Sequence, residues 1–168
     1  ALVNAAGSNT FAGAIILGSS SVIASDNGSL TLTNSTATSG SGDLTLTGSG
    51  AGTLAGALGH SGGLNKTGTG AWTLTGTGGT STGALSVTNG TLNFVAGSLG
   101  TPSATTLGSA TLNLTSGSQS IGDLTLTAGS NSSIIAAAST ALTTGTITRN
   151  AGAIANFNIA AVGSSLPT

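Results

Sequence analysis

The chain has 168 residues, of which only two are Lys or Arg and three are Asp or Glu, and its formal net charge is −1. Two cations cannot line a protein face with positive charge, so this composition excludes electrostatic binding to nucleic acid. Cysteine is absent, so no disulfide crosslinks the chain, and no apolar run approaches the ~20 residues that a membrane-spanning helix needs.

Short segments in which apolar and polar residues alternate recur along the chain, and this period of two is typical of β-strands. Gly, Asn or Ser bounds most of them, and these residues tolerate turn conformations. In chain order the predicted strands are 29–33, 43–47, 71–75, 85–88, 91–95, 111–115, 123–127, 146–148 and 154–159. Helix signals are nearly absent because glycine interrupts almost every window. The best helical candidate, 133–142, is equally compatible with the edge of a coil.

The predicted strands return at an interval of about twenty residues. The hexapeptide GDLTLT stands at 42–47 and again, unchanged, at 122–127, and the segment 91–94 recurs in similar form at 111–114. A fixed period of this size is typical of a solenoid, whose turns bury their apolar faces only by stacking on each other. We therefore predict an all-β fold: one parallel β-helix domain over residues 1–168, with about 20 residues per coil. We expect an irregular excursion near 97–108, because Pro102 cannot donate to a strand ladder.

The period of two also assigns side chains to the inside or the outside of the coils. The predicted core columns contain Leu44, Leu64, Trp72, Leu74, Leu92, Phe94, Leu112, Leu114, Leu124 and Leu126. The predicted outward faces contain Thr45, Thr47, Asn93, Asn113, Thr125 and Thr127, and the two Asn lie one coil apart, where they can form a ladder. For Trp72 the alternative to the core is an exposed ring that stacks on sugars.

Lys66 conflicts with this assignment. It falls in the inward column of Leu46 and Leu126, where an unpaired Lys is unfavourable. Either the chain bends so that Lys66 extends its amine outward, or the register slips by one residue.

Residues 63–76, GLNKTGTGAWTLTG, together with Leu85, Val87, Gly90, Leu92 and Phe94, resemble the passenger-associated repeat of bacterial autotransporters. The Asn-Thr-aromatic-x-Gly element of that repeat is missing between these parts, but it occurs at 9–13. The resemblance implies a right-handed parallel β-helix that is exported to the surface of a Gram-negative-type cell or beyond. Since the chain opens at Ala1 without Met, we expect a mature or excerpted segment of a longer precursor.

Few residues are suited to catalysis or to metal binding. Asp43 and Asp123 occupy the same position of the repeated hexapeptide, four coils or ~19 Å apart, too far to act on one bond. Each follows a Gly at a strand entrance, where Asp commonly forms turns. We expect His60, the single imidazole, to be solvated or to cap a turn, and three or four zinc ligands are not available. We therefore predict no catalytic, metal-binding or cofactor-binding residue and no enzymatic activity.

Three functions remain open. The first is a stiff extracellular rod that assembles head to tail with copies of itself, or with the remainder of a longer rod, into surface fibres. Its ends contain Ile15, Ile16, Ile154 and Ile159 without the charges that usually protect strand edges, apart from Arg149 at the margin. The second is an adhesin passenger that binds surface receptors or glycans. The third is ice binding by Thr-x-Thr pairs, but a strict period of twenty aligns only Thr45 with Thr125.

Overall fold

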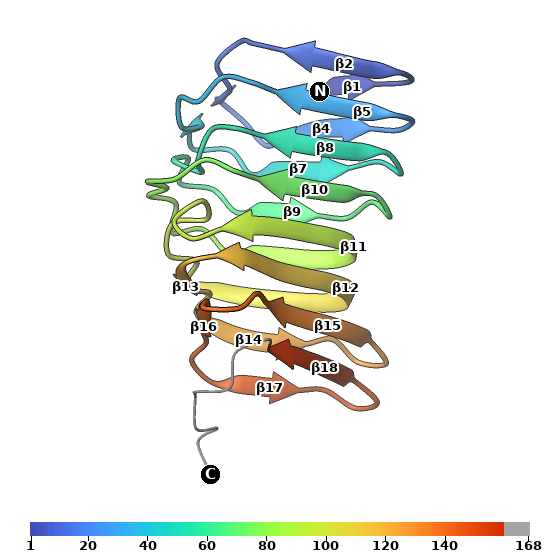
Figure 1. The fold of residues 1–168 in the computed structure, drawn as a ribbon, viewed down its shortest axis with the longest axis vertical. Coiled ribbons are helices and arrows are strands. Elements are labelled where there is room, and N and C mark those ends of the chain that lie inside the picture. Colours follow the sequence, from blue (N-terminus) through green and yellow to red (C-terminus); the bar gives the residue numbers. More distant parts are fainter. Residues whose placement is uncertain (160–168) are drawn as a thin grey trace.

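The computed structural model describes residues 1–159 as a stack of β-coils that runs from the N-terminal to the C-terminal end (Figure 1). These residues form eighteen strands and no helix, and hence no helix that is long and apolar enough to cross a membrane. All the strand pairs are parallel, as in Leu2 with Ile23 and Ser8 with Ser29. The predicted fold class, an all-β parallel solenoid, is therefore confirmed.

Two columns of stacked strands form most of the wall. Column A consists of β1 (Leu2–Asn4), β4 (Ser21–Ser25), β7 (Leu44–Thr47), β9 (Leu64–Lys66), the first part of β11 (Leu85–Val95), the first part of β12 (Ala104–Ser116), β14 (Asp123–Leu126) and β17 (Ile147–Arg149). Column B consists of β2 (Ser8–Phe11), β5 (Ser29–Leu32), β8 (Ala51–Leu54), β10 (Ala71–Leu74), the second parts of β11 and β12, β15 (Asn131–Ala136) and β18 (Ile154–Ile159).

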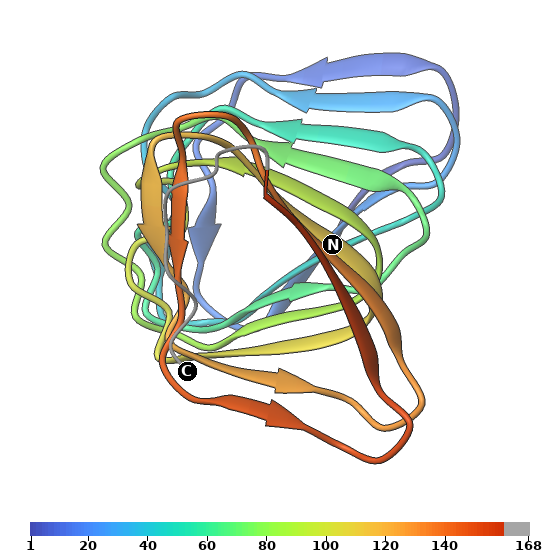
Figure 2. The same ribbon diagram turned by 60° about the horizontal axis from the view of Figure 1, so that its bottom comes forward.

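A third, less regular side closes each coil. It carries the pairs β3 (Ile16–Leu17) with β6 (Ser39–Gly40) and β13 (Ser118–Ser120) with β16 (Ala141–Thr143). Figure 2 shows the coils as loops whose two long sides are columns A and B. The space they enclose is filled by the core side chains.

The repeat is close to the predicted length but is not constant. One row of column A runs through Leu2, Ile23, Leu46, Lys66, Val87, Leu107, Leu126 and Arg149, which is 147 residues in seven steps, or 21 per coil. Single steps vary from 19 residues, between Ala104 and Asp123, to 23, between Leu124 and Ile147. The corners absorb this variation, so the strands stay in register while the spacing in sequence changes.

The structure decides two local predictions. The irregular segment ends at residue 103, because β12 starts at Ala104 and buries Leu107 in the core. Gln119 fixes this segment, since its Nε2 donates to the Gly100 carbonyl at 2.7 Å and its Oε1 accepts from the Gly97 nitrogen at 2.9 Å. Of the two alternatives for 133–142, the structure contains the coil edge and not the helix: the segment is the end of β15, a turn and the start of β16.

The structure buries all ten side chains of the predicted core columns: Leu44, Leu64, Trp72, Leu74, Leu92, Phe94, Leu112, Leu114, Leu124 and Leu126. Trp72 is fully buried, and its indole Nε1 donates to the Thr47 carbonyl at 3.1 Å, so its ring is not available to stack on a sugar. The six predicted outward residues, Thr45, Thr47, Asn93, Asn113, Thr125 and Thr127, are all partly exposed.

Lys66 keeps its register and does not extend outward, which corrects the expectation for this residue. It pairs with Leu46 and Val87 in column A and is fully buried. Its ammonium group donates to the carbonyl of Gly68 and, at 3.0 Å, to the carbonyl of Asn89 in the next coil. Backbone carbonyls at the corner between columns A and B therefore satisfy a cation that has no carboxylate partner among the described residues.

Candidate functional surfaces

Two of the three carboxylates have the same structural role. Asp43 Oδ1 accepts a hydrogen bond of 2.7 Å from the Gly63 nitrogen, and Asp123 Oδ1 accepts one of 2.7 Å from the Thr146 nitrogen. In both cases the carboxylate binds the backbone at the entrance of a strand in the next coil. Asp26 is exposed beside Asn27 and Gly28, and its carbonyl accepts from Ser49. The two strand-entrance carboxylates thus connect successive coils.

His60 is buried in the irregular side of the stack rather than solvated, so the expectation of a solvated side chain was wrong. Its Nδ1 lies 2.8 Å from Thr38 Oγ1, and its Nε2 lies 3.4 Å from the Gly63 carbonyl. Since a carbonyl only accepts, Nε2 carries the proton and Nδ1 accepts from the Thr38 hydroxyl. Burial lowers the pKa of His60, while the Gly63 carbonyl and the Asp43 charge oppose this shift.

The contact between Thr38 and His60 has the geometry of a nucleophile and a general base. However, Thr38 is only 2% exposed and His60 is 0% exposed, so a substrate cannot reach either side chain in this structure. Within residues 1–159, no three metal-ligating side chains cluster. The single histidine and the single lysine therefore lie inside the wall, whereas Asp26, Asp43, Asp123 and Arg149 are exposed. The larger accessible features are the two ends and the two outward faces.

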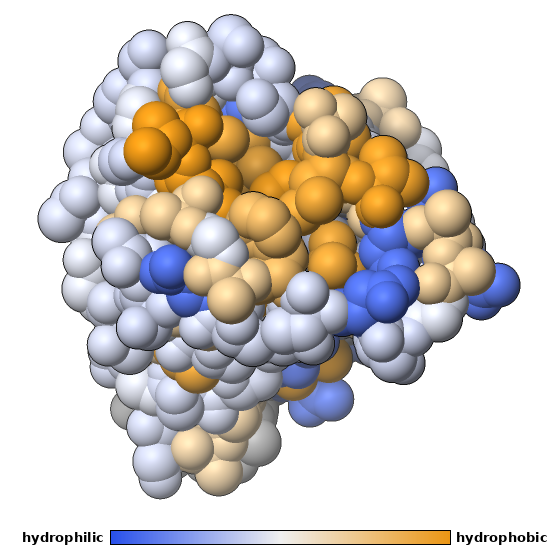
Figure 3. Space-filling model, turned by 90° about the horizontal axis from the view of Figure 1, so that it is seen from above, coloured by the Kyte–Doolittle hydropathy of each residue, from blue (hydrophilic) through white to orange (hydrophobic). Residues whose placement is uncertain are grey.

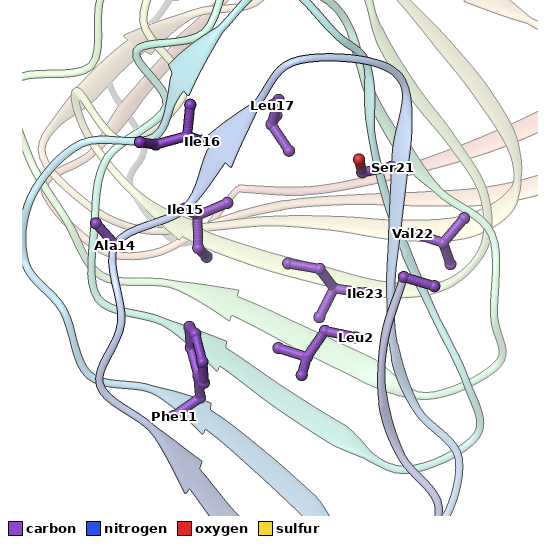
Figure 4. A pocket seen from close by; sticks show the side chains of 10 residues that line it. Leu2, Phe11, Ala14, Ile15, Ile16, Leu17, Ser21, Val22 and Ile23 are labelled. Atoms are coloured by element: carbon purple, nitrogen blue, oxygen red, sulfur yellow. The ribbon is translucent and has the colours of Figure 1, made fainter.

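The N-terminal end of the stack is an open apolar surface (Figure 3). Strand β1 and strand β2 each have a neighbour on one side only, and the side chains of Val3 and Ile16 are 54% and 74% exposed. A hollow of about 210 Å³ lies between the first strands, and the close-up in Figure 4 shows apolar side chains converging on it from several strands. It is lined by Ala1, Leu2, Phe11, Ala14, Ile15, Ile16, Leu17, Ser21, Val22 and Ile23.

The C-terminal end of the described stack has a similar character. Strands β17 and β18 each pair with a preceding coil, and within residues 1–159 no strand covers their other edge. Ile147, Ile154 and Phe157 are 48%, 62% and 48% exposed. Of the four predicted end residues, Ile16 and Ile154 are exposed and Ile15 is half-buried, while the side chain of Ile159 lies outside the described residues.

The outward face of column B carries an uncharged ladder. Thr10, Thr31, Thr53, Thr73, Asn93 and Asn113 occupy one row in six successive coils. Asn113 Nδ2 donates to Asn93 Oδ1 at 2.8 Å, and Asn93 Nδ2 donates to Thr73 Oγ1 at 3.4 Å, so the predicted Asn ladder is present and continues to Thr73.

This row also corrects the prediction that Thr31 and Thr73 lie in different columns. They share a row because the steps between them are 22 and 20 residues rather than a constant twenty. On column A a second row contains Val22, Thr45, Asn65, Ser86, Thr106, Thr125 and Thr148.

No protein-family model matches this chain, and neither a curated protein nor a solved structure matches it.

Proposed function

We propose that this chain is a non-enzymatic extracellular structural module: a stiff β-solenoid rod that joins head to tail with copies of itself, or with the remainder of a longer rod, to form surface fibres. The observation that carries this proposal is the relation between the two ends. Within residues 1–159, each end presents strands of the same two columns that pair on one side only, β1 and β2 at one end and β17 and β18 at the other, flanked by exposed apolar side chains.

The direction of the strands favours a head-to-tail joint. Because every ladder is parallel, placing β17 of one copy against β1 of the next, and β18 against β2, continues both columns without reversing the chain. A contact between two different surfaces does not close on itself and generates an open fibre. Exposed strand edges are templates for such pairing, and the four outermost strands, β1, β2, β17 and β18, carry a single charged side chain, that of Arg149 in β17.

The sides of the rod are suited to close packing between neighbouring fibres. No charged residue lies between Lys66 and Asp123, and Lys66 itself is buried. Lateral contacts therefore meet little charge repulsion. The outward Thr and Asn ladders add the regular polar surface that stacked β-assemblies use.

Electron microscopy and sedimentation at increasing protein concentration test the proposal. We expect fibres or end-to-end oligomers whose axis follows the strand stacking of ~4.8 Å. Ile16→Lys combined with Ile154→Lys should abolish growth and leave a folded monomer, since both side chains lie at the ends. The matched control is Thr106→Lys, which places the same charge on the side of the rod and should leave end-to-end growth intact.

A chain that stays monomeric at high concentration with both ends ordered would contradict the filament proposal. It would favour the alternative, an autotransporter-type adhesin passenger that binds receptors or glycans through its polar faces. The resemblance of residues 63–94 to autotransporter repeats supports export to the cell surface under either function.

Ice binding is a second candidate, and the threonine row of column B favours it. Thr10, Thr31, Thr53 and Thr73 repeat at strand spacing on one face, presenting hydroxyl and methyl groups in a regular array. If this face binds ice, Thr53→Tyr should abolish inhibition of ice recrystallisation, whereas Thr106→Tyr on column A should not. Absence of inhibition by the unmodified protein would exclude this candidate.

A further inference from the structure

The chain contains two Asn-Gly pairs, Asn27-Gly28 and Asn89-Gly90, and both form corners between column A and column B. Gly28 and Gly90 have positive φ angles of 89° and 67°. A Cβ at Gly28 would lie 2.3 Å from the Gly7 carbonyl oxygen, and a Cβ at Gly90 would lie 2.4 Å from the Gly68 carbonyl oxygen. The fold therefore requires glycine at both corners, which makes the two pairs a matched comparison within one molecule.

In each corner a donor from the preceding coil binds the Asn carbonyl. Asn4 Nδ2 donates to the Asn27 carbonyl at 3.4 Å, and Lys66 Nζ donates to the Asn89 carbonyl at 3.0 Å. The donor and the acceptor are 23 residues apart in both cases. The two contacts differ in charge, because Asn4 offers a neutral amide and Lys66 an ammonium group.

The corner at Asn89 also folds the Asn side chain back onto the peptide that follows it. The Gly90 nitrogen donates to Oδ1 of Asn89 at 2.8 Å, so the side-chain amide lies against the peptide whose nitrogen attacks Cγ in succinimide formation. Among the described residues, the Gly28 nitrogen donates no such hydrogen bond to the side chain of Asn27. Asn89 is exposed, so water reaches its side chain.

We infer that Asn89-Gly90 is a self-modification site at which Asn89 deamidates through a succinimide, promoted by the hydrogen bond from Lys66. The Gly90 nitrogen gives up its proton and bonds to Cγ of Asn89, and the side-chain amide group leaves as ammonia. Water then opens the ring at either carbonyl and leaves aspartate or isoaspartate at position 89. These reaction steps involve no oxidation or reduction, and water is the only co-reactant.

Lys66 assists at the first step. When the peptide between Asn89 and Gly90 loses its proton, the negative charge spreads onto the Asn89 carbonyl oxygen, which is the atom that Lys66 binds. The hydrogen bond from the Lys66 ammonium is charge-assisted and partly buried, so it stabilises the anion at Asn89 more than the neutral amide of Asn4 stabilises the anion at Asn27. The product also adds a negative charge to the part of the chain between Lys66 and Asp123, which otherwise has none.

Incubation of the folded protein in heavy-oxygen water at neutral pH, followed by peptide mapping with a protease of broad specificity, measures this reaction at both sites. We expect label to enter position 89 about tenfold faster than position 27. In the chain unfolded by guanidinium the two sites should react at similar rates, because the corner contacts are gone. Lys66→Met should reduce the rate at position 89 to that at position 27 and leave position 27 unchanged.

Two results would overturn the inference. One is labelling at position 27 that is as fast as, or faster than, labelling at position 89 in the folded parent protein. This comparison requires no variant, so it remains valid even if Lys66→Met fails to fold. The other is a folded Lys66→Met protein in which position 89 still reacts at the original rate.

Discussion

The Trp72 indole ring occupies the space into which a side chain at Gly52 would project. The two residues are partners in adjacent strands of column B, and a Cβ on Gly52 would lie 2.3 Å from the ring. The next partner of Trp72 is Leu92, which is fully buried. Gly52 thus creates room in its own coil for the largest side chain of the core.

Gly52→Ala should destabilise the fold by about 2 kcal/mol, because the ring is held in a packed core and cannot move away. In a Trp72→Leu background the same substitution should cost less or become stabilising, since the smaller side chain leaves space for the new methyl group. A double-mutant cycle by urea unfolding measures the coupling. Additive effects at the two positions would contradict the contact.

Lys66 should make stability depend on pH in the alkaline range. Burial lowers its pKa from 10.5 to about 8. Between these values the unfolded chain binds more protons than the folded chain, so the free energy of unfolding should rise as pH increases through this window, by at most about 3 kcal/mol. Urea unfolding at a series of pH values gives the slope directly.

Lys66→Met is the matched variant for that measurement. It removes the titrating group but keeps a long side chain, so it should abolish the rise in stability between pH 8 and 10.5. We also expect it to be more stable than the parent at neutral pH, where a buried ammonium costs desolvation energy. An unchanged alkaline slope in the variant would show that another group titrates there.

His60 should make the stability of the fold depend on pH in the acidic range. Its folded-state pKa lies below the ordinary value of 6.5 because it is buried. The unfolded chain therefore binds the proton first, and stability should fall as pH decreases below 6.5. As His60 is the only histidine, unfolding measured between pH 5 and 7 reports this group, and His60→Gln should flatten the curve.

Leu112→Asp and Thr125→Asp distinguish the inside from the outside of the wall. Leu112 is fully buried between Leu92 and Ile134, so an unpaired carboxylate there should cost several kcal/mol and prevent folding. Thr125 is partly exposed on column A, where the same charge should change stability by about 0.5 kcal/mol or less. Circular dichroism and thermal unfolding compare the two variants, and equal losses would contradict the assigned faces.

The sequence alone determined the class of fold and most of the core. Alternation such as Leu44-Thr45-Leu46 fixes which side of a strand is apolar, and a repeat near twenty residues requires coils that bury this side by stacking. Both signals are local or strictly repeated, so they can be read without coordinates. The inward position of Trp72 and the ladder of Asn93 and Asn113 follow from the same two periods.

The tertiary structure alone decided what the corners do. The number of residues from one coil to the next varies from 19 to 23, and the strands stay in register because the corners differ in length. This variation aligns Thr31 with Thr73, which a fixed period of twenty does not predict. Lys66 stays inside because the carbonyls of Gly68 and Asn89 accept hydrogen bonds from its ammonium group. His60 stays inside because Thr38 and Gly63 form hydrogen bonds with its ring. Gly68 and Gly63 are sequence neighbours of these two residues, but Asn89 and Thr38 lie 23 and 22 residues away and reach them only when coils stack, so the local sequence does not encode the burial of either side chain.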